Sequence, residues 1–220
     1  MNDSKITIYW AGALFNHKEL IGNSLLAKAV EKASHGRCSV RLPQDIEEEA
    51  IQNAVDIRNA DLAELIQCDA LIANFDGADL DSGTVVEFCI AKALDMPTVL
   101  LRTDFRNGGE SNDLPWNLMC AGWPRTEILL ANALADYQRY TIRHGDDFQS
   151  AIDNWHNNLA CRIIQSLDNV CAMPPWMSAD VAVDHFRRTV QSIGGGLSLI
   201  LPDETLAALV ERKRQKHLLA

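Results

Sequence analysis

Short apolar segments alternate with helix-like segments over the first 130 residues, and this alternation constrains the fold more than any other feature of the sequence. The strand-like segments are residues 6–13, 39–42, 69–75, 98–101 and 127–130. Between them, apolar side chains recur every three or four residues, as on a helix with one buried face, over residues 17–34, 47–67 and 82–94. Strands and helices in this order imply right-handed crossovers and a sheet covered on both faces. We therefore predict an α/β fold with a doubly wound, mainly parallel five-stranded sheet and flanking helices.

The character of the chain changes beyond about residue 146, where only helical patterns remain. These patterns cover residues 148–167, 179–193 and 204–218, and Gly194–Gly196 is expected to be a flexible break between the last two. We expect an α/β domain over residues 1–145 and a helical C-terminal extension over residues 146–220, packed on the same domain or in an oligomer interface. The basic run Arg212–Lys216 is interpreted as a solvated helix end in preference to a phosphate site.

Acidic side chains outnumber basic ones by thirty to twenty, which gives a formal net charge of −10 at pH 7. This balance argues against general binding to nucleic acid or to anionic membranes, because both require a basic surface. Twelve carboxylates and one basic residue, Arg58, lie between Asp45 and Glu87. Most of these carboxylates are expected on solvated helix faces, and an acidic pocket is the alternative for a few of them.

Nothing in the sequence indicates a membrane span, a secretory signal or a metal site. No apolar stretch approaches the roughly 18 to 20 residues of a membrane helix, and the first residues lack the features of a signal peptide. The six cysteines include no C-x-x-C pair, and the six histidines have no ligand-like spacing. Glycine motifs of the Walker or dinucleotide-binding type are also missing from the sequence. We expect a cytoplasmic protein with reduced cysteines, without a metal or a cofactor.

The segment from Asp76 to Glu87 places carboxylates where open parallel sheets bind their ligands, outside the carboxyl ends of the strands. Glu87 lies six residues beyond Asp81, so it can project from the predicted helix toward a pocket that Asp81 reaches from the loop. Glycosyl transfer uses two carboxylates in different surroundings. One attacks or stabilises the anomeric carbon, and the other handles a proton or a sugar hydroxyl.

A purely structural role is the alternative for these carboxylates. Asp79 and Asp81 would then be turn and capping residues, with Ser82 as the N-cap of the helix, and Glu87 would be a surface charge. The neighbours of Glu87 argue for a special role, because residues 85–90 are otherwise apolar. A carboxylate buried among apolar side chains is costly unless it is partnered.

Four motifs, in this order, resemble those of the nucleoside 2-deoxyribosyltransferases. They read Tyr-Trp-Ala-Gly-Ala-Leu-Phe at residues 9–15, Asn-Ala-Asp-Leu at 59–62, Asp-Ser-Gly-Thr-Val-Val-Glu at 81–87 and Pro-Trp-Asn-Leu-Met at 115–119. Each motif is short, but their common order and spacing make the resemblance specific over residues 5–130. The resemblance implies a double-displacement exchange of the base of a 2′-deoxyribonucleoside. It makes 2′-deoxyribonucleosides and free nucleobases the expected small-molecule partners.

The resemblance also assigns catalytic roles. Glu87 matches the family's nucleophile, which attacks C1′ and forms a covalent 2-deoxyribosyl-enzyme. Asp61 matches the acidic residue that meets the nucleobase and assists proton transfer to the leaving base and from the incoming one. Tyr9 corresponds to a tyrosine that hydrogen-bonds the nucleophile and orients it.

Other residues are implied to bind the substrate. Asp81 matches a carboxylate associated with the sugar, and Gly12 belongs to the first motif. Asn117 matches an amide that reaches a sugar hydroxyl, often in the site of a neighbouring subunit, so a homo-oligomer is expected. Gln44 and Asp45, at the end of the second predicted strand, are weaker candidates for contact with the base.

Two other functions remain open. A (deoxy)nucleoside 5′-monophosphate N-glycosidase would use the same glutamate and let water take the glycosyl-enzyme. It would need donors for the phosphate, and Ser82 and residues 102–106 are the candidates. A catalytically inactive nucleoside-sensing module would keep the pocket without turnover, but both Asp61 and Glu87 are intact. The sequence therefore favours a transferase acting on uncharged nucleosides.

Overall fold

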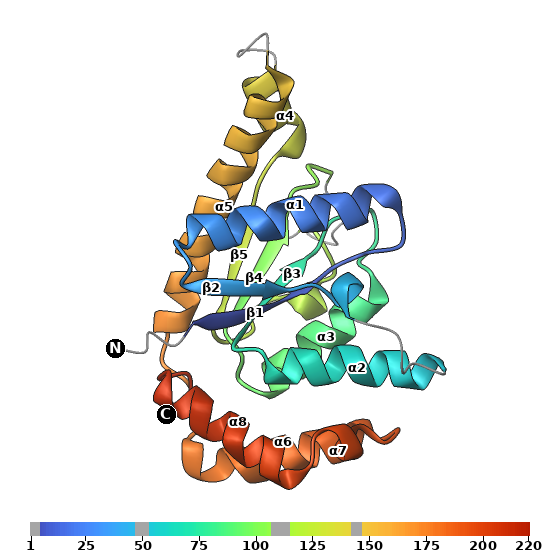
Figure 1. Ribbon diagram of the computed structural model, residues 1–220, viewed down its shortest axis with the longest axis vertical. Coiled ribbons are helices and arrows are strands. Elements are labelled where there is room, and N and C mark those ends of the chain that lie inside the picture. Colours follow the sequence, from blue (N-terminus) through green and yellow to red (C-terminus); the bar gives the residue numbers. More distant parts are fainter. Residues whose placement is uncertain (1–4, 47–52, 107–114, 142–146) are drawn as a thin grey trace.

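Five parallel strands form the centre of the protein, in the spatial order β2-β1-β3-β4-β5 (Figure 1). The computed structural model describes residues 5–46, 53–106, 115–141 and 147–220. The strands are β1 (Ile6–Ala11), β2 (Cys38–Arg41), β3 (Ala70–Asn74), β4 (Thr98–Arg102) and β5 (Thr126–Leu130). Each strand pairs in parallel with its neighbours. The predicted α/β fold with a five-stranded sheet is confirmed.

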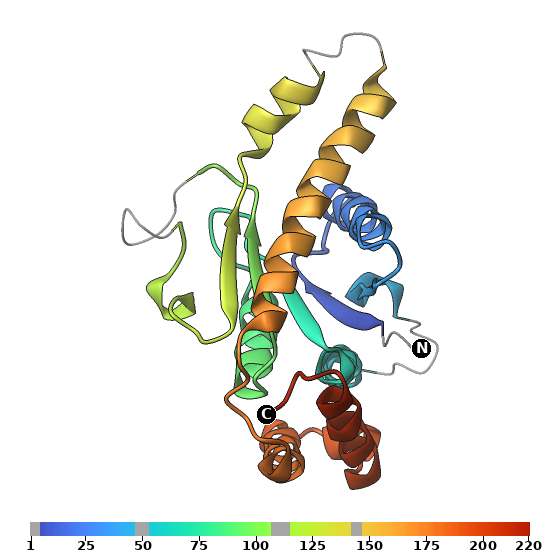
Figure 2. The ribbon, with the colours of Figure 1, turned by 90° about the vertical axis from the view of Figure 1, so that its left-hand side faces the viewer.

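Helices cover both faces of the sheet, as expected for a doubly wound fold (Figure 2). α1 (His17–Ala33) and α5 (Phe148–Ala172) pack on one face, and α2 (Ala54–Gln67) and α3 (Ser82–Ala93) pack on the other. These positions agree with the helices predicted from the apolar spacing. The first residues of the predicted 47–67 helix, 47–52, lie outside the described residues.

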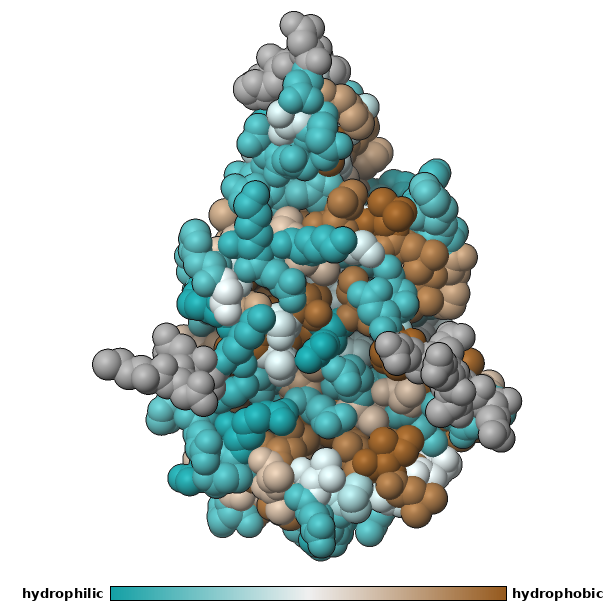
Figure 3. Space-filling model, viewed as in Figure 1, coloured by the Kyte–Doolittle hydropathy of each residue, from teal (hydrophilic) through white to brown (hydrophobic). Residues whose placement is uncertain are grey.

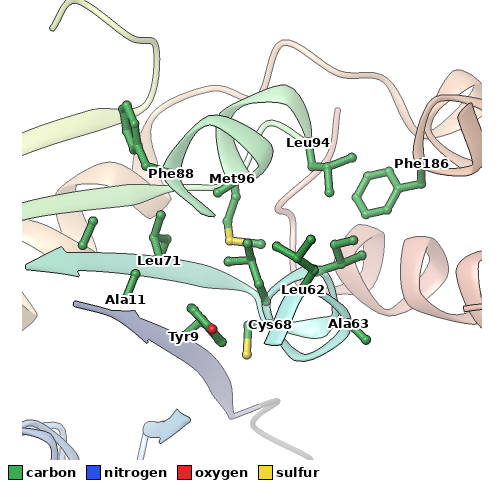
Figure 4. Close-up of a cluster of buried hydrophobic side chains, with 14 of the residues drawn as sticks. Tyr9, Ala11, Leu62, Ala63, Cys68, Leu71, Phe88, Leu94, Met96 and Phe186 are labelled. Atoms are coloured by element: carbon green, nitrogen blue, oxygen red, sulfur yellow. The ribbon is translucent and has the colours of Figure 1, made fainter. Parts of the chain in front are cut away.

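The two aromatic residues at the centre of β1 point to opposite faces of the sheet, because successive side chains on a strand alternate. Tyr9 packs in the core under α2 and α3, together with Leu62 and Phe88 (Figure 4). Trp10 packs in the core on the other face, which includes Leu159 of α5. This alternation directs Tyr9 toward the two helices that carry Asp61 and Glu87.

Two of the described α-helices are not predicted from the sequence, one after β5 and a short one at Leu197–Ile200. α4 (Ala133–Thr141) follows β5, and the Asn132 side chain caps it by accepting from the backbone N–H of Ala135 at 2.9 Å. α4 packs against α5, and the rings of Tyr137 and Trp155 meet edge to face. α4 was missed because it buries little apolar surface: Leu134 and Tyr137 are both exposed, so no periodic buried face marks it.

Three C-terminal helices lie beside the amino ends of the strands, at the bottom of Figure 1. They are α6 (Ala179–Ile193), α7 (Leu197–Ile200) and α8 (Asp203–Gln215). The layer is attached through the turn between α3 and β4, where Asp95 accepts from the backbone N–H groups of Trp176 and Met177 at 2.9 and 3.0 Å. Apolar side chains gather on the surface near α7 (Figure 3), where Leu199 is 85% exposed.

The interpretation of Arg212–Lys216 as a solvated helix end is wrong for Lys213 and Lys216, whereas the other three residues of the run are exposed. Lys213 is buried and donates to the carbonyl oxygen of Cys68, and Arg212 donates to that of Gln67. Lys216 pairs with the buried carboxylate of Asp69 at 2.6 Å. These cations accumulate at the carboxyl end of α2, where unpaired helix carbonyls favour positive charge.

Candidate active site

Tyr9 and Glu87 form a direct hydrogen bond between β1 and α3. The Tyr9 hydroxyl donates to Glu87 Oε1 at 2.6 Å, and Tyr9 itself is completely buried. Figure 4 shows Tyr9 on β1, among the buried side chains beneath α3. The sequence separation of 78 residues is bridged because β1 and α3 pack against each other. The structure therefore contains the hydrogen bond between Tyr9 and Glu87 that the family resemblance predicts.

The environment raises the pKa of Glu87 to about 7. Burial is the main cause, because it disfavours the charged carboxylate, and the nearby charges of Asp61 and Asp81 add to it. The hydrogen bond from Tyr9 acts in the opposite direction by stabilising the carboxylate. Burial also raises the pKa of Tyr9 far above its ordinary value, with the charge of Glu87 as the next cause, so Tyr9 keeps its proton and remains a donor.

Asp61 faces the same pair of residues from α2. The side chain is partly buried, and its charge raises the pKa values of both Tyr9 and Glu87. α2 packs against α3, which brings the two helices and their carboxylates to one side of the sheet. Asp61, Tyr9 and Glu87 thus come from three separate elements and meet at one place.

Asp81 is the N-cap of α3, and the assignment of Ser82 to this role is wrong. Asp81 Oδ2 accepts from the backbone N–H of Thr84 at 2.7 Å and from its hydroxyl at 2.9 Å. Thr84 is buried, and it stands three residues after the cap, where the backbone N–H commonly donates to an N-cap side chain. The cap holds Asp81 close enough for its charge to act on Glu87.

Gly12 and Asn117 lie outside this group of contacts. Gly12 follows β1, and a Cβ at this position would lie 3.1 Å from the Cβ of Asn74, so any larger residue would crowd the end of β3. Asn117 is exposed, and its side-chain oxygen accepts from the backbone N–H of Met119 at 2.9 Å. The neighbouring Trp116 is buried and packs edge to face on Phe75, which anchors this segment.

A cavity of about 740 Å³ separates α3 from the segment of Asn117. Its lining includes Ser82 and Val86 of α3 together with Asn117 and Met119. The structure therefore brings Tyr9, Asp61, Asp81 and Glu87 together and places Asn117 across a neighbouring cavity.

The side chain of Gln44 is hydrogen-bonded to α1. Its amide nitrogen donates to the carbonyl oxygen of Leu20 and to the hydroxyl of Ser24, both at 2.9 Å, whereas Asp45 is exposed. No group of three or more His, Cys, Asp or Glu side chains suited to a metal ion occurs in the described part of the chain. None of the described helices is long and apolar enough to cross a membrane.

This arrangement suits covalent chemistry at an electrophilic carbon. A partly buried carboxylate with a pKa near neutrality is a better nucleophile than an ordinary surface carboxylate, and a buried tyrosine fixes its orientation. A second carboxylate within electrostatic range is available to handle a proton.

Comparisons with known proteins match a family and solved structures. The sequence model of the family described as nucleoside 2-deoxyribosyltransferase matches residues 8–119, just over half of the chain. A conserved protein from Enterococcus faecalis V583 is 27% identical with a TM-score of 0.46, and the match covers 53% of this chain and 84% of that one. A 2-desoxiribosyltransferase from Leishmania mexicana is 25% identical with a TM-score of 0.45, over 69% of this chain and 97% of that one. No curated protein gives a significant match.

Proposed function

Because the chain belongs to the nucleoside 2-deoxyribosyltransferase family, we propose that it moves 2-deoxyribose from one nucleobase to another through a covalent ester on Glu87. The family consists of enzymes that bind nucleosides, and it includes glycosidases as well as pentosyltransferases. The observation that carries the proposal is the 2.6 Å hydrogen bond from buried Tyr9 to Glu87. It supports a carboxylate that is oriented for attack.

The first half-reaction forms the ester. The carboxylate oxygen of Glu87 that does not accept from Tyr9 attacks C1′, and the C1′–N bond breaks with its electron pair moving to the base. Asp61 in its protonated form delivers its proton to the departing base, so a neutral base leaves and Asp61 is left as a carboxylate. Asp81 binds the sugar beside the nucleophile.

The second half-reaction reverses these steps with a new base. A ring nitrogen of the incoming base attacks C1′, the C1′–O bond to Glu87 breaks, and the carboxylate is restored. The proton displaced from the incoming base passes to Asp61, which returns the site to its starting state. No external oxidant or reductant is required, since one C–N bond replaces another.

The outer substrate contacts complete the proposal. Gly12 allows the end of β1 to approach Asn74 closely, and the family resemblance assigns it to the sugar site. Asn117, which is exposed, reaches a sugar hydroxyl in the site of a second copy, so the active form is a homo-oligomer.

Hydrolysis of a 5′-monophosphate receives less support from the charges around the site. Arg102 donates to the carbonyl oxygens of Gly77 and Arg106 at 3.1 and 2.8 Å, and the guanidinium of Arg106 pairs with Asp104. Arg102 lines the 740 Å³ cavity, but both terminal nitrogens of its guanidinium already donate to backbone carbonyl oxygens, and Arg106 is paired with Asp104. We keep an uncharged 2′-deoxyribonucleoside as the proposed substrate.

Product analysis tests this function. The protein is incubated with deoxyinosine or thymidine, with and without adenine, and the products are separated by chromatography. The proposal predicts deoxyadenosine formation that depends on added adenine and is lost in Glu87→Gln. Release of free deoxyribose at a rate that adenine does not change, or turnover of the 5′-monophosphate alone, would identify a glycosidase instead.

A further inference from the structure

The C-terminal extension contacts α2 at two places: the glycine turn meets Arg58 and Asn59, and α8 meets the carboxyl end of the helix. α2 lies between α3 on one side and α7 on the other, and it packs against both (Figure 1). α3 carries Glu87, and α2 carries Asp61. The extension therefore contacts α2, which carries Asp61, on the side of α2 that faces away from α3 and Glu87.

The glycine turn, residues 194–196, is joined to α2 by the buried side chain of Asn59. The Asn59 amide nitrogen donates to the carbonyl oxygen of Gly195 at 2.7 Å, and Asn59 is only 3% exposed. Arg58 closes the contact, since its guanidinium donates both to the Asn59 side-chain oxygen at 2.7 Å and to the carbonyl oxygen of Gly194 at 3.2 Å.

The turn is shaped for this contact. Gly195 has a φ of +65°, and a Cβ on it would lie 2.1 Å from an Arg58 guanidinium nitrogen. Gly196 has a similar φ of +88°, but a Cβ there would meet only Leu199 at an ordinary 3.9 Å. Two glycines of one turn thus share a left-handed backbone and differ in whether a side chain would disturb α2.

The carboxyl end of α2 is held by the same extension. Arg212 and Lys213 of α8 donate to the carbonyl oxygens of Gln67 and Cys68, which end the helix. α2 is therefore held by one structural layer at Arg58 and Asn59 and again at its carboxyl end.

Asn59 and Asp61 lie on different sides of α2. On a helix of about 3.6 residues per turn, two positions that are two residues apart are separated by a rotation of about 200°. Asn59 faces the extension, and Asp61 faces Tyr9 and Glu87, on which its charge acts. Because Asn59 and Asp61 lie within one turn of the same helix, a displacement of α2 at Asn59 also displaces Asp61.

We propose that the glycine turn of the C-terminal extension, through the positioning residue Asn59, sets the distance between Asp61 and Glu87. The effect on catalysis rests on the proposed exchange reaction. The distance between Asp61 and Glu87, however, is a property of the protein without substrate. This control of the distance gives the extension, which carries none of the proposed catalytic groups, a role in the site.

The test measures the titration of the Glu87 carboxyl by NMR in the full-length protein without substrate, with Glu87→Gln used to assign the signal. The groups that face this carboxyl are Tyr9, Asp61 and Asp81. Asn59→Leu keeps the volume and charge of the side chain but removes its hydrogen bond, and Gly195→Ala displaces Arg58. Both variants should shift the titration midpoint of Glu87, because the position of the Asp61 charge relative to this carboxyl changes, whereas Gly196→Ala should leave the midpoint unchanged.

A double-mutant comparison separates positioning from general loosening of the fold. In an Asp61→Asn background, Asn59→Leu should no longer shift the midpoint, because the charge that it repositions is gone. In the exchange assay, Asn59→Leu should lower kcat/KM by about tenfold or more on its own and much less in that background, since general acid–base groups contribute about 10²- to 10⁴-fold.

An unchanged midpoint in both Asn59→Leu and Gly195→Ala, with thermal unfolding showing that both are folded, overturns the inference. An equal shift in the Asp61→Asn background overturns it as well. Failure of the proposed function is distinguished from these outcomes, because it appears as absent base exchange in the unmodified protein and leaves the titration experiment intact.

Discussion

The surroundings of Glu87 disfavour its charged carboxylate form, and the hydrogen bond from Tyr9 stabilises that form. Burial and the charges of Asp61 and Asp81 raise the pKa of Glu87 to about 7, and the hydrogen bond from Tyr9 limits the rise. A nucleophile must be ionised to attack, so the opposing effects set the pH at which the site becomes active. The balance is a property of four side chains and can be tested one residue at a time.

The pH dependence of exchange should change in Tyr9→Phe. In the unmodified protein, Glu87 is protonated below about pH 7, so kcat/KM should fall as the pH drops through this value. Removing the hydroxyl removes the hydrogen bond that lowers the pKa of Glu87, and the acidic limb should move to higher pH. At about pH 6 we expect a loss of about tenfold, the value of one charge-assisted hydrogen bond. A limb that stays in place or moves to lower pH would contradict this account.

At this scale, the sequence indicated the position of Glu87 but not its surroundings. Its apolar flanks suggested a buried carboxylate, and the family resemblance supplied Tyr9 and Asp61. The sequence offers Ser82 as the cap of α3 and, in the purely structural interpretation, Asp81 as well, because both residue types are good caps. The choice depends on the backbone, which is extended at Asp81 with φ −61° and ψ 126°.

At the scale of elements, α3 begins at the carboxylate that is proposed to bind the sugar. Asp81 therefore has two tasks, since its Oδ2 caps the helix through Thr84 and its charge acts on Glu87. A change at Asp81 affects both the stability of α3 and the site unless the substitution keeps the cap.

Asp81→Ser and Asp81→Ala separate these tasks. Serine can still accept from the Thr84 N–H, so only Asp81→Ala should lose about 1 kcal/mol of unfolding free energy, measured by urea denaturation. Both variants should lose exchange activity by about tenfold or more, because neither provides a carboxylate for the sugar. If Asp81→Ser kept full activity, the residue would be a helix cap only.

Most elements could be predicted because their sequences carry a strong periodic signal. The buried strands and the helices α1 and α3 have apolar residues at the spacing that their packing requires. α4 spans only nine residues, and the one that it buries is the charged Asp136. It packs along one side of α5 and leaves Leu134 and Tyr137 exposed. Its capping residue, Asn132, was the local cue that remained.

At the scale of the whole molecule, the C-terminal layer is fastened by buried charges beside the amino ends of the strands. Lys216 pairs with Asp69 at 2.6 Å, and Lys213 lies close by. Burial by itself would raise the pKa of Asp69, but Lys213, Lys216 and the Thr7 N–H together hold it below its ordinary value. The stabilisation from Asp69 is therefore present at neutral pH and is lost as the pH falls through the lowered pKa.

Asp69→Asn should destabilise the protein by about 3 kcal/mol, because it leaves buried cations without their counter-charge. Asp168→Asn is the matched control. It breaks the exposed pair with Arg37, at 3.0 Å, and should cost less than about 1 kcal/mol. Urea denaturation at neutral pH compares the two variants, and equal losses would show that the buried cluster contributes no more than a surface pair.

These contacts could not be read from the sequence, because the basic residues of α8 and their partners are far apart along the chain. A run of Lys and Arg at the end of a helix is usually solvated, and local patterning contains nothing that distinguishes Lys213. Its burial follows from the packing of α8 on the end of α2, which only the tertiary structure defines.

Mixing two inactive variants tests whether the active form is an oligomer with shared sites. Glu87→Gln lacks the nucleophile, and Asn117→Ala lacks the amide proposed to reach a second copy. If the sites are shared, mixed oligomers contain some sites with both groups intact, so the mixture should regain exchange activity. Activity equal to the average of the separate samples would place Asn117 in the site of its own subunit.

The central claim is that Glu87 carries the sugar, and mass spectrometry of the trapped enzyme tests it most directly. The protein is mixed with a 2′-deoxyribonucleoside without an acceptor base, quenched in acid and digested. We predict that the peptide containing Glu87 gains the mass of one 2-deoxyribosyl group, that added base removes it, and that Glu87→Gln never acquires it. A folded, active enzyme that showed no adduct on this peptide, or showed it on another residue, would contradict the account.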